Sequence, residues 1–385
     1  MKGSLKRQSW LALLCCAVLA LFQGNAQAED GDNVESSARS AVLIERQTGR
    51  VLLSHNAHEA LPMASTTKVM TALLALEKGD VDDVVSVGRN AYGVPGTSIY
   101  LGLGEKITLR DLLYGLMLAS GNDAAVAIAE HIAGDVSNFC QMMTQRAQGL
   151  GCENTRFLTP HGLPSREHYT TAADLAKIAQ EAMKHDLFRQ IVSTRRASIP
   201  WEGRNYHRVL NNKNKLLSDY EGATGIKTGY TKAAGRCLVF GAKRDGLEVI
   251  GVVLNCGNWF DEAARLMDVG FERYEMFTAL EEGETVRVLP VKEGTQETVT
   301  ICTAASLAVP VRKGQIPVME FDLPDEVEAG CEAGSQVGEA RLLLDGQTAV
   351  SVPLVLGETL AVRDYTFELQ RMVRNWPVQM QTIAE

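Results

Sequence analysis

The sequence predicts an α/β (α+β) protein in which an antiparallel sheet, flanked by helices, carries an all-α insertion and is followed by a small all-β C-terminal domain. Three observations predict this architecture. Apolar strand-like runs occur near the start of the chain and again after residue 237, helical periodicity fills the region between them, and short β-branched runs dominate from residue 284. Strand runs that enclose a helical stretch favour one sheet built from both ends of a domain.

The first 28 residues have the pattern of a secretory signal. Three basic residues precede an apolar run over 10–22, and Ala26-Gln27-Ala28 forms a small-residue cleavage site. The run has 13 residues, fewer than the roughly 20 that span a bilayer. We therefore expect a cleaved signal and an exported protein, in the periplasm or at the outer face of the cytoplasmic membrane; an uncleaved anchor is the alternative.

Composition excludes some classes of function. The chain after residue 28 carries 35 basic and 47 acidic residues, a net charge of −12, so nucleic acid is not an expected partner. Its six cysteines include no C-x-x-C pair, and no histidines have ligand spacing, so neither a metal nor another cofactor is expected. The pairs Cys140 with Cys152 and Cys302 with Cys331 could form disulfides, and buried free thiols are the alternative.

The predicted sheet begins with two strands, 41–44 and 51–53, around a glycine-bearing turn. The segment 66–78 then combines apolar residues at helical spacing with good helix formers. This places Ser65 at a helix N-terminus with Lys68 one turn further on, where the two side chains can meet.

The all-α insertion runs from residue 109 to about residue 184. Its amphipathic pieces are 112–119, 124–132, 138–147 and 172–183, and Thr170 or Thr171 is the expected N-cap of the last piece. The sheet resumes with strands at 237–243 and 247–254, joined by the hairpin signal Asp245-Gly246. An amphipathic helix over 260–274 closes this domain.

The region 284–360 is the predicted small all-β domain, a spacer or a protein-contacting module. The strand-like runs in it are 286–289, 299–302, 307–311, 316–321, 341–344 and 348–355. The tail, 361–385, has apolar residues at helical spacing and three arginines. It predicts an amphipathic helix with two alternative roles: peripheral contact with a membrane, or docking on the β domain.

Three short motifs carry the chemistry. Ser65-Thr66-Thr67-Lys68 supplies a hydroxyl and an amine, Ser120-Gly121-Asn122 a hydroxyl and an amide, and Lys227-Thr228-Gly229 an amine beside a hydroxyl and a glycine. They follow one another at separations of 55 and 107 residues. Each motif alone is a weak signal, but the ordered set is typical of an acyl-transfer site that works without histidine.

This ordered set resembles the low-molecular-mass penicillin-binding proteins, the serine-type D-alanyl-D-alanine carboxypeptidases. The resemblance runs from about residue 41 to residue 274, and more loosely to residue 360. It implies a penicillin-binding/β-lactamase-like catalytic domain over 38–278. It also implies removal of the terminal D-alanine from peptidoglycan stem peptides ending in D-Ala-D-Ala, which limits cross-linking, and covalent acylation by β-lactam antibiotics.

The residues themselves indicate roles for the first motif. A serine hydroxyl needs a proton acceptor, and Lys68 is the titratable group that sequence spacing places within reach of Ser65. A lysine accepts a proton only when it is neutral, and burial beside a second cation, Lys227, favours that form.

The other roles follow the resemblance. Ser120 would pass the proton to the departing amine, and Asn122 would hold the substrate amide. Lys227 and Thr228 would bind the terminal carboxylate, and Gly229 would leave space for an extended substrate. The oxyanion hole would consist of the backbone N–H groups of Ser65 and Tyr230.

One departure from the family pattern concerns the carboxylate. Many relatives carry a basic residue near the start of the segment after the last strand, whereas this chain has residues 255–261 without one, and Arg265 is the nearest candidate. Several related activities differ from this one in what they require of the sequence. A class A β-lactamase would need a deacylating glutamate in a Glu-x-x-Leu-Asn motif, which is absent between residues 120 and 227. A large transpeptidase would need an N-terminal module. A D,D-endopeptidase and a non-catalytic penicillin-binding sensor share the three motifs and remained alternatives.

Overall fold

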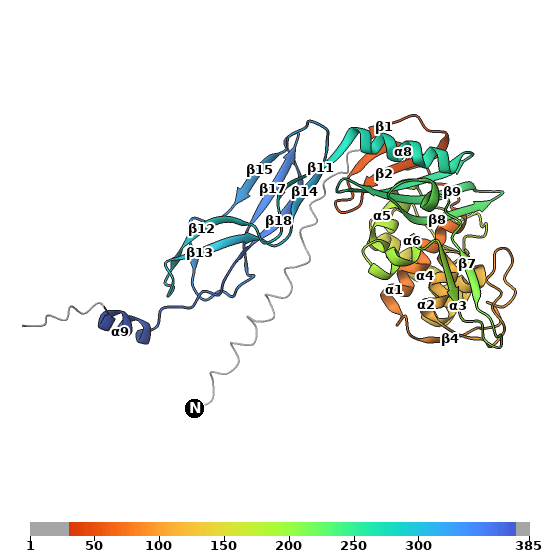
Figure 1. Ribbon diagram of the computed structural model, residues 1–385, viewed down its shortest axis with the longest axis horizontal. Coiled ribbons are helices and arrows are strands. Elements are labelled where there is room, and N and C mark those ends of the chain that lie inside the picture. The colour runs from red at the N-terminus through yellow and green to blue at the C-terminus, as the bar shows by residue number, and fades with distance from the viewer. Residues whose placement is uncertain (1–30, 375–385) are drawn as a thin grey trace, which may run out of the picture.

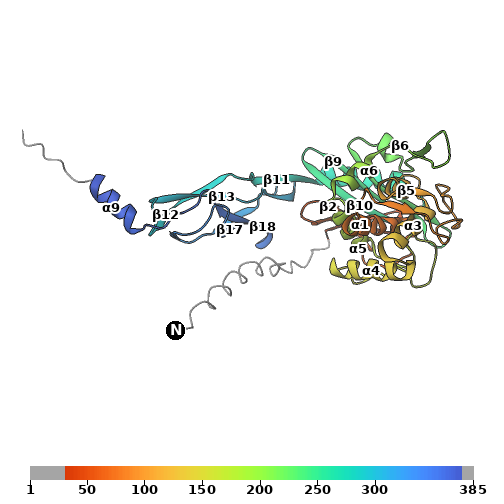
Figure 2. The same cartoon turned by 90° about the horizontal axis from the view of Figure 1, so that it is seen from below.

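A computed structural model describes residues 31–374 of the chain. The predicted signal, residues 1–28, and the end of the tail, residues 375–385, lie outside the described part. The described residues form two domains that lie end to end, and a short helix, α9 (Tyr365–Arg374), extends from the far end of the second domain (Figures 1 and 2).

The first domain is built on a six-stranded sheet with the order β1-β3-β2-β10-β9-β8. All neighbours are antiparallel except β1 and β3, so the predicted antiparallel sheet is confirmed with one short parallel edge. The strands are β1 (Asp32–Asn33), β2 (Ala38–Glu45), β3 (Val51–His55), β8 (Ala223–Thr231), β9 (Gly235–Arg244) and β10 (Leu247–Cys256). The predicted hairpin turn joins β9 to β10, with Asp245 at φ 49° and Gly246 at φ 82°.

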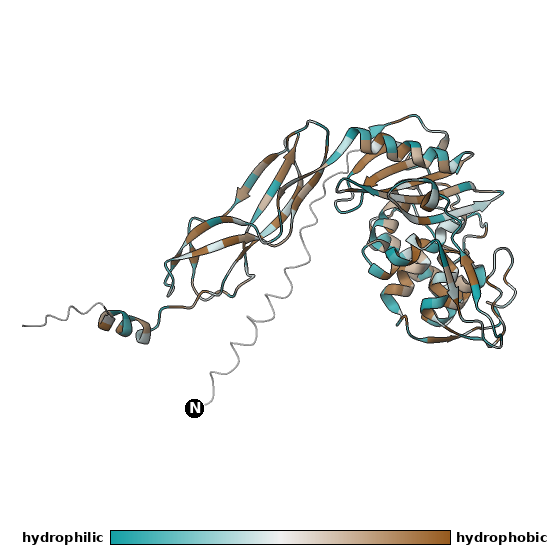
Figure 3. Ribbon diagram, viewed as in Figure 1, coloured by the Kyte–Doolittle hydropathy of each residue, from teal (hydrophilic) through white to brown (hydrophobic). Residues whose placement is uncertain are grey.

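Helices cover both faces of this sheet, and successive residues of the strands face alternate sides. Leu43 and Val253 pack under α8 (Trp259–Arg273), whereas Val42 and Val252 face the core shared with the helical subdomain. Figure 3 shows the apolar strands between these helical layers, and Figure 1 shows α8 along one side of the sheet. Helix α1 (Lys68–Lys78), which follows the predicted nucleophile Ser65, lies in the larger core, so its start is held rigidly against the sheet.

The predicted all-α insertion over 109–184 is present as α2 (Leu109–Met117), α3 (Asn122–Ala133), α4 (Val136–Gly149) and α5 (Ala172–Ala182). Two further helices, α6 (Asp186–Ser193) and α7 (Leu216–Asp219), follow it and were not predicted. Thr171, one of the two predicted caps, accepts a hydrogen bond from the Asp174 N–H at the start of α5. Two small hairpins were not predicted: β4 (Val84–Ser86) with β5 (Lys106–Thr108), and β6 (Arg196–Ile199) with β7 (Arg208–Asn211).

The second domain is all-β, as predicted. Its strands are β11 (Tyr274–Leu280), β12 (Thr285–Lys292), β13 (Thr298–Thr303), β14 (Leu307–Arg312), β15 (Val318–Asp322), β16 (Val327–Glu328), β17 (Gln336–Leu344) and β18 (Gln347–Leu356). Strand β11 was not predicted; it follows α8 directly and pairs with β14. At the junction of the two domains, Asp32 forms ion pairs with Arg273 and Arg312.

The six cysteines of the described chain are all free thiols, and four of them are buried. Neither disulfide that the sequence left open is formed. Burial raises the pKa of the Cys140 thiol to about 11 and that of the Cys152 thiol to about 12, so both stay protonated near neutral pH. These residues behave as core side chains rather than as reactive groups.

A buried ion pair ties the β6–β7 hairpin to the loop before β5. Arg208 donates to both oxygens of Glu105, at 2.6 and 2.7 Å, and both side chains are almost fully buried. Trp201 covers the guanidinium at 4.4 Å from its ring centroid. A bidentate pair excluded from water is costly to break from one side, because the remaining charge stays buried.

We therefore predict that Glu105→Gln lowers the free energy of unfolding by about 3–5 kcal/mol. Asp82→Asn, which breaks the exposed Arg110–Asp82 pair, should cost less than about 1 kcal/mol. Urea denaturation of the two variants measures both effects, and equal shifts would contradict the account.

Candidate active site

The predicted nucleophile lies in a strained turn rather than in a regular helix end. Residues Ala64–Thr67 form a 3₁₀ turn, η1, and the α-helix begins only at Lys68. Ala64 has φ 49°, a left-handed value that a residue with a side chain adopts at a cost. The Thr66 hydroxyl donates to the Met63 carbonyl at 2.5 Å and steadies the turn. Ser65 itself is half-buried and faces the start of α1.

Lys68 is the centre of the hydrogen-bonded cluster. Its side chain is fully buried, and its Nζ lies 3.1 Å from Ser65 Oγ, 2.8 Å from Asn122 Oδ1 and 2.7 Å from the His161 carbonyl oxygen. The last two partners can only accept hydrogen bonds. The structure therefore brings the predicted pair Ser65 and Lys68 together and adds a backbone carbonyl that sequence spacing did not reveal.

The second motif contacts Lys68 through its asparagine. The Asn122 amide donates from Nδ2 to the Pro95 carbonyl at 2.7 Å, which leaves Oδ1 for Lys68 and fixes the orientation of the amide. Ser120 is 4% exposed and sits at φ 65°, another left-handed backbone. In the described chain the Lys68 amine bonds to Asn122 and not to Ser120.

A loop that sequence analysis did not single out holds the second motif. The carboxylate of Asp123, 1% exposed, accepts hydrogen bonds from the backbone N–H groups of Ile99 and Leu101 and from the Ser98 hydroxyl. The preceding residue, Asn122, donates its own N–H to the Thr97 carbonyl at 2.7 Å. The loop 95–101 and the start of α3 are thus one rigid wall beside Lys68.

The third motif lies on edge strand β8. Lys227 and Thr228 are buried, and Lys227 Nζ donates to the Thr228 carbonyl at 2.9 Å. A Cβ atom on Gly229 would lie only 2.9 Å from the Ser65 nitrogen. Gly229 is therefore required for the close approach of the strand to the nucleophile turn. Tyr230, the next residue of β8, is 61% exposed.

Three lysines set the electrostatics of the site. Burial, followed by the charges of Lys227 and Lys213, lowers the pKa of Lys68 well below the ordinary value, against the opposite effect of Asp123. Burial and Lys213 also lower the pKa of Lys227, to about 7. Lys213 follows β7 and was missed by the sequence analysis, because it belongs to none of the three motifs.

The candidate that the sequence offered for carboxylate binding is engaged elsewhere. Arg265 donates to Glu262 at 2.6 Å and to the Glu35 carbonyl at 2.8 Å. Its guanidinium therefore holds the N-terminal segment against α8. The lysine that joins Lys68 and Lys227 at the site is Lys213.

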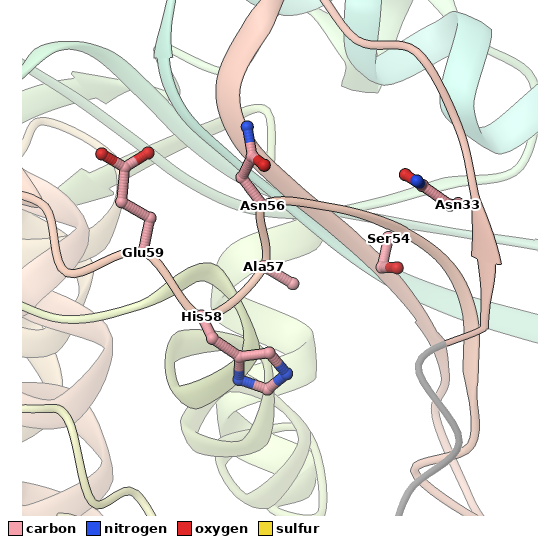
Figure 4. Close-up of a pocket in the computed structure, with 6 residues that line it drawn as sticks. All are labelled: Asn33, Ser54, Asn56, Ala57, His58 and Glu59. Atoms are coloured by element: carbon pink, nitrogen blue, oxygen red, sulfur yellow. The ribbon is translucent and has the colours of Figure 1, made fainter.

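Two further features of the described residues lie outside the three motifs. No cluster of three or more ligating side chains suits a metal ion among residues 31–374. A polar hollow of about 570 Å³ lies beside the end of β3, and it is bordered by none of the predicted site residues. Figure 4 shows that its Glu59 carboxylate and His58 ring point away from each other, and Glu59 is paired with Arg39.

Comparison with known families gives matches over both domains. A family model described as D-alanyl-D-alanine carboxypeptidase matches residues 25–258. A second, described as the C-terminal domain of penicillin-binding protein 5, matches residues 274–361.

Individual relatives carry the same family description and match over most of the chain. The D-alanyl-D-alanine carboxypeptidase DacF of Bacillus subtilis is 33% identical, over 94% of this chain and 97% of its own length. DacC of Escherichia coli, of the same description, is 30% identical over 89% of this chain and 90% of its own. The crystal structure of penicillin-binding protein 5 from Haemophilus influenzae superposes with a TM-score of 0.70 at 29% identity, covering 85% of this chain and 98% of that one.

The coupling of the lysines gives a prediction for pH dependence. The charge of Lys213 lowers the pKa of Lys68, so Lys213→Ala should raise that pKa and leave less neutral amine at a given pH. The acid limb of the pH profile for acylation by penicillin should move to higher pH, by a fraction of a unit. Lys213→Arg keeps the charge and should leave the limb in place; an unmoved limb in the alanine variant would count against the coupling.

Proposed function

Because this chain belongs to the D-alanyl-D-alanine carboxypeptidase family, we propose that it removes the terminal D-alanine from peptidoglycan stem pentapeptides through an acyl-enzyme on Ser65. The observation that carries the proposal is the set of partners around Lys68. Its two shortest contacts, with Asn122 and with the His161 carbonyl, use two N–H bonds. A neutral amine then has one lone pair left, and the Ser65 hydroxyl lies next to it at 3.1 Å.

Acylation begins when Ser65 Oγ attacks the carbonyl carbon of the D-Ala–D-Ala amide and its proton moves to Lys68 Nζ. The developing oxyanion takes hydrogen bonds from the backbone N–H groups of Ser65 and Tyr230. Gly229, directly before Tyr230, lets strand β8 approach the Ser65 nitrogen closely. Ser120 carries the proton to the departing nitrogen. The C–N bond breaks, D-alanine leaves, and water later opens the ester with the same lysine as base.

The substrate carboxylate is recognised by Lys227, Thr228 and Lys213. The low pKa of Lys227, about 7 in the free site, rises when an anion binds next to it, because an opposite charge favours the ammonium form. Carboxylate binding therefore recharges Lys227 while Lys68 stays a base. A β-lactam presents a similar amide and carboxylate, but its leaving nitrogen remains tethered to the acyl group, so the acyl-enzyme persists.

The family acts on the cell wall outside the cytoplasm, and we propose export through the signal at residues 1–28. We also propose that the C-terminal helix rests on the membrane surface. Helix α9 exposes Tyr365, Leu369 and Met372, which are 82%, 49% and 62% accessible and recur at helical spacing. It extends from the β domain instead of packing on it (Figure 2), and no helix of the described residues is long and apolar enough to cross a bilayer.

The catalytic assignments predict the behaviour of two variants. Ser65→Ala should abolish D-alanine release from diacetyl-Lys-D-Ala-D-Ala and covalent labelling by penicillin, because both need the same oxygen. Lys68→Ala should slow acylation by about 10²–10⁴-fold. Lys78→Ala, an exposed lysine at the other end of α1, is the matched control and should keep the full rate. Labelling that survives in the serine variant would mean that the nucleophile is misassigned.

The membrane proposal predicts that Leu369→Ser combined with Met372→Ser loses co-sedimentation with vesicles of anionic and neutral phospholipid, because the apolar face is removed. Gln370→Ser, on the same helix, should bind as the unchanged protein does. Equal sedimentation of all three proteins would overturn this role of the tail.

A further inference from the structure

A buried histidine outside the three motifs contacts the nucleophile turn. His168 is 3% exposed, and its Nε2 lies 2.8 Å from Thr67 Oγ1, two residues after Ser65. The other ring nitrogen, Nδ1, accepts a hydrogen bond from the Leu158 N–H at 3.0 Å. The ring also packs edge-on against Phe157. His168 is thus held on both sides, and one side is the element that carries the nucleophile.

These contacts fix the tautomer of the ring. A backbone N–H can only donate, so Nδ1 must present its lone pair to Leu158, and the ring proton must lie on Nε2. Nε2 therefore donates to the Thr67 hydroxyl. That hydroxyl in turn donates to the Ala64 carbonyl at 2.8 Å. The result is a directed chain of hydrogen bonds from His168 through Thr67 to Ala64.

The end of this chain is the strained residue of the turn. Ala64 holds φ 49° directly before Ser65, a conformation that costs about 1–3 kcal/mol and persists only where the surroundings enforce it. The same carbonyl is also confined by Gly162, because a Cβ atom there would lie 1.8 Å from it. A hydrogen bond to this carbonyl therefore acts on the backbone that orients the nucleophile.

The segment that carries His168 is bound to the nucleophile element along its length. The backbone of Thr170 exchanges two hydrogen bonds with Leu61, at 2.8 and 3.0 Å, just before the turn. The Pro160 carbonyl accepts from the Thr71 hydroxyl at 2.6 Å, further along α1. His168 is therefore placed by a rigid support.

We propose that His168 is a positioning residue: its Nε2–H orients the Thr67 hydroxyl, which holds the Ala64 carbonyl and so keeps Ser65 Oγ aligned with Lys68 Nζ. The proposal rests on the proposed function of Ser65 as nucleophile. Burial lowers the pKa of His168 to about 4. The ring is therefore neutral near neutral pH, as the chain of hydrogen bonds requires.

The test breaks this chain of hydrogen bonds at each of its links. It compares the rate of D-alanine release with the thermal stability of each variant. Thr67→Val keeps the shape of the side chain and removes the hydroxyl, and His168→Leu removes the donor. For D-alanine release we expect kcat to fall about 10–100-fold, since small misplacements of reacting groups cost this much, with KM changed by less than about twofold. Thr67→Ser restores the hydroxyl and should recover most of the rate.

A matched control separates an effect on the alignment of Ser65 from a general effect on the stability of the fold. Thr71→Val removes another buried threonine hydroxyl that bonds to the same segment, but it leaves the chain to Ala64 intact. It should lower the melting temperature as Thr67→Val does and leave kcat unchanged. Saturating fluorescent penicillin counts the folded, competent sites in each preparation, so that every rate is given per active site.

The double variant Thr67→Val with His168→Leu gives the decisive comparison. The two substitutions break links of the same hydrogen-bond chain, so their losses of rate should not add. The double variant should therefore be no slower than the slower single variant. Additive losses, or a folded Thr67→Val enzyme with unchanged kcat, would overturn the proposal. Failure of the unchanged protein to release D-alanine would instead refute the proposed function, and the rates of penicillin labelling would still test the positioning of Ser65.

Discussion

The burial of Lys68 is the constraint on which the rest of the site depends. A fully buried ammonium is costly, and two neighbouring lysines make it costlier, so the neutral amine is favoured. Once the amine is neutral, its hydrogen-bonding capacity matches its surroundings, because two carbonyl oxygens take its two N–H bonds. The remaining lone pair faces Ser65. A residue type that is usually a surface cation is thereby suited to the role of base that we propose for Lys68.

The architecture serves this burial by enclosing Lys68 from several directions. The sheet edge β8 brings Lys227 and the glycine that lets it approach the turn, and the loop 95–101 holds Asn122. The segment 155–171 supplies the His161 carbonyl from a third side. Two of the residues with left-handed backbone lie at the site: Ala64, directly before Ser65, and Ser120 of the second motif. Such strain requires a rigid core, and both turns lie against the largest hydrophobic cluster of the molecule.

Sequence reasoning reached the elements and contacts whose signals are local. The Asp245-Gly246 turn, the Thr171 cap and the pairing of Ser65 with Lys68 all follow from spacings of a few residues. Contacts made through the backbone or by distant residues gave no such signal. The His161 carbonyl, the charge of Lys213 and the left-handed Ala64 depend on tertiary packing, and alanine is not a residue type that indicates positive φ. Strand β11 was missed because its partner, β14, lies beyond two further strands of the chain.

The most direct measurement is the protonation state of Lys68 itself. Nitrogen-15 NMR of the protein labelled at its lysine side chains, with Lys68→Arg used to assign the signal, reports whether Nζ is an amine or an ammonium. We predict an amine signal for Lys68 at neutral pH in the free enzyme, while exposed lysines such as Lys78 give ammonium signals. An ammonium signal for Lys68 that persists well above neutral pH would contradict the account, because the base for Ser65 would then have to be another group.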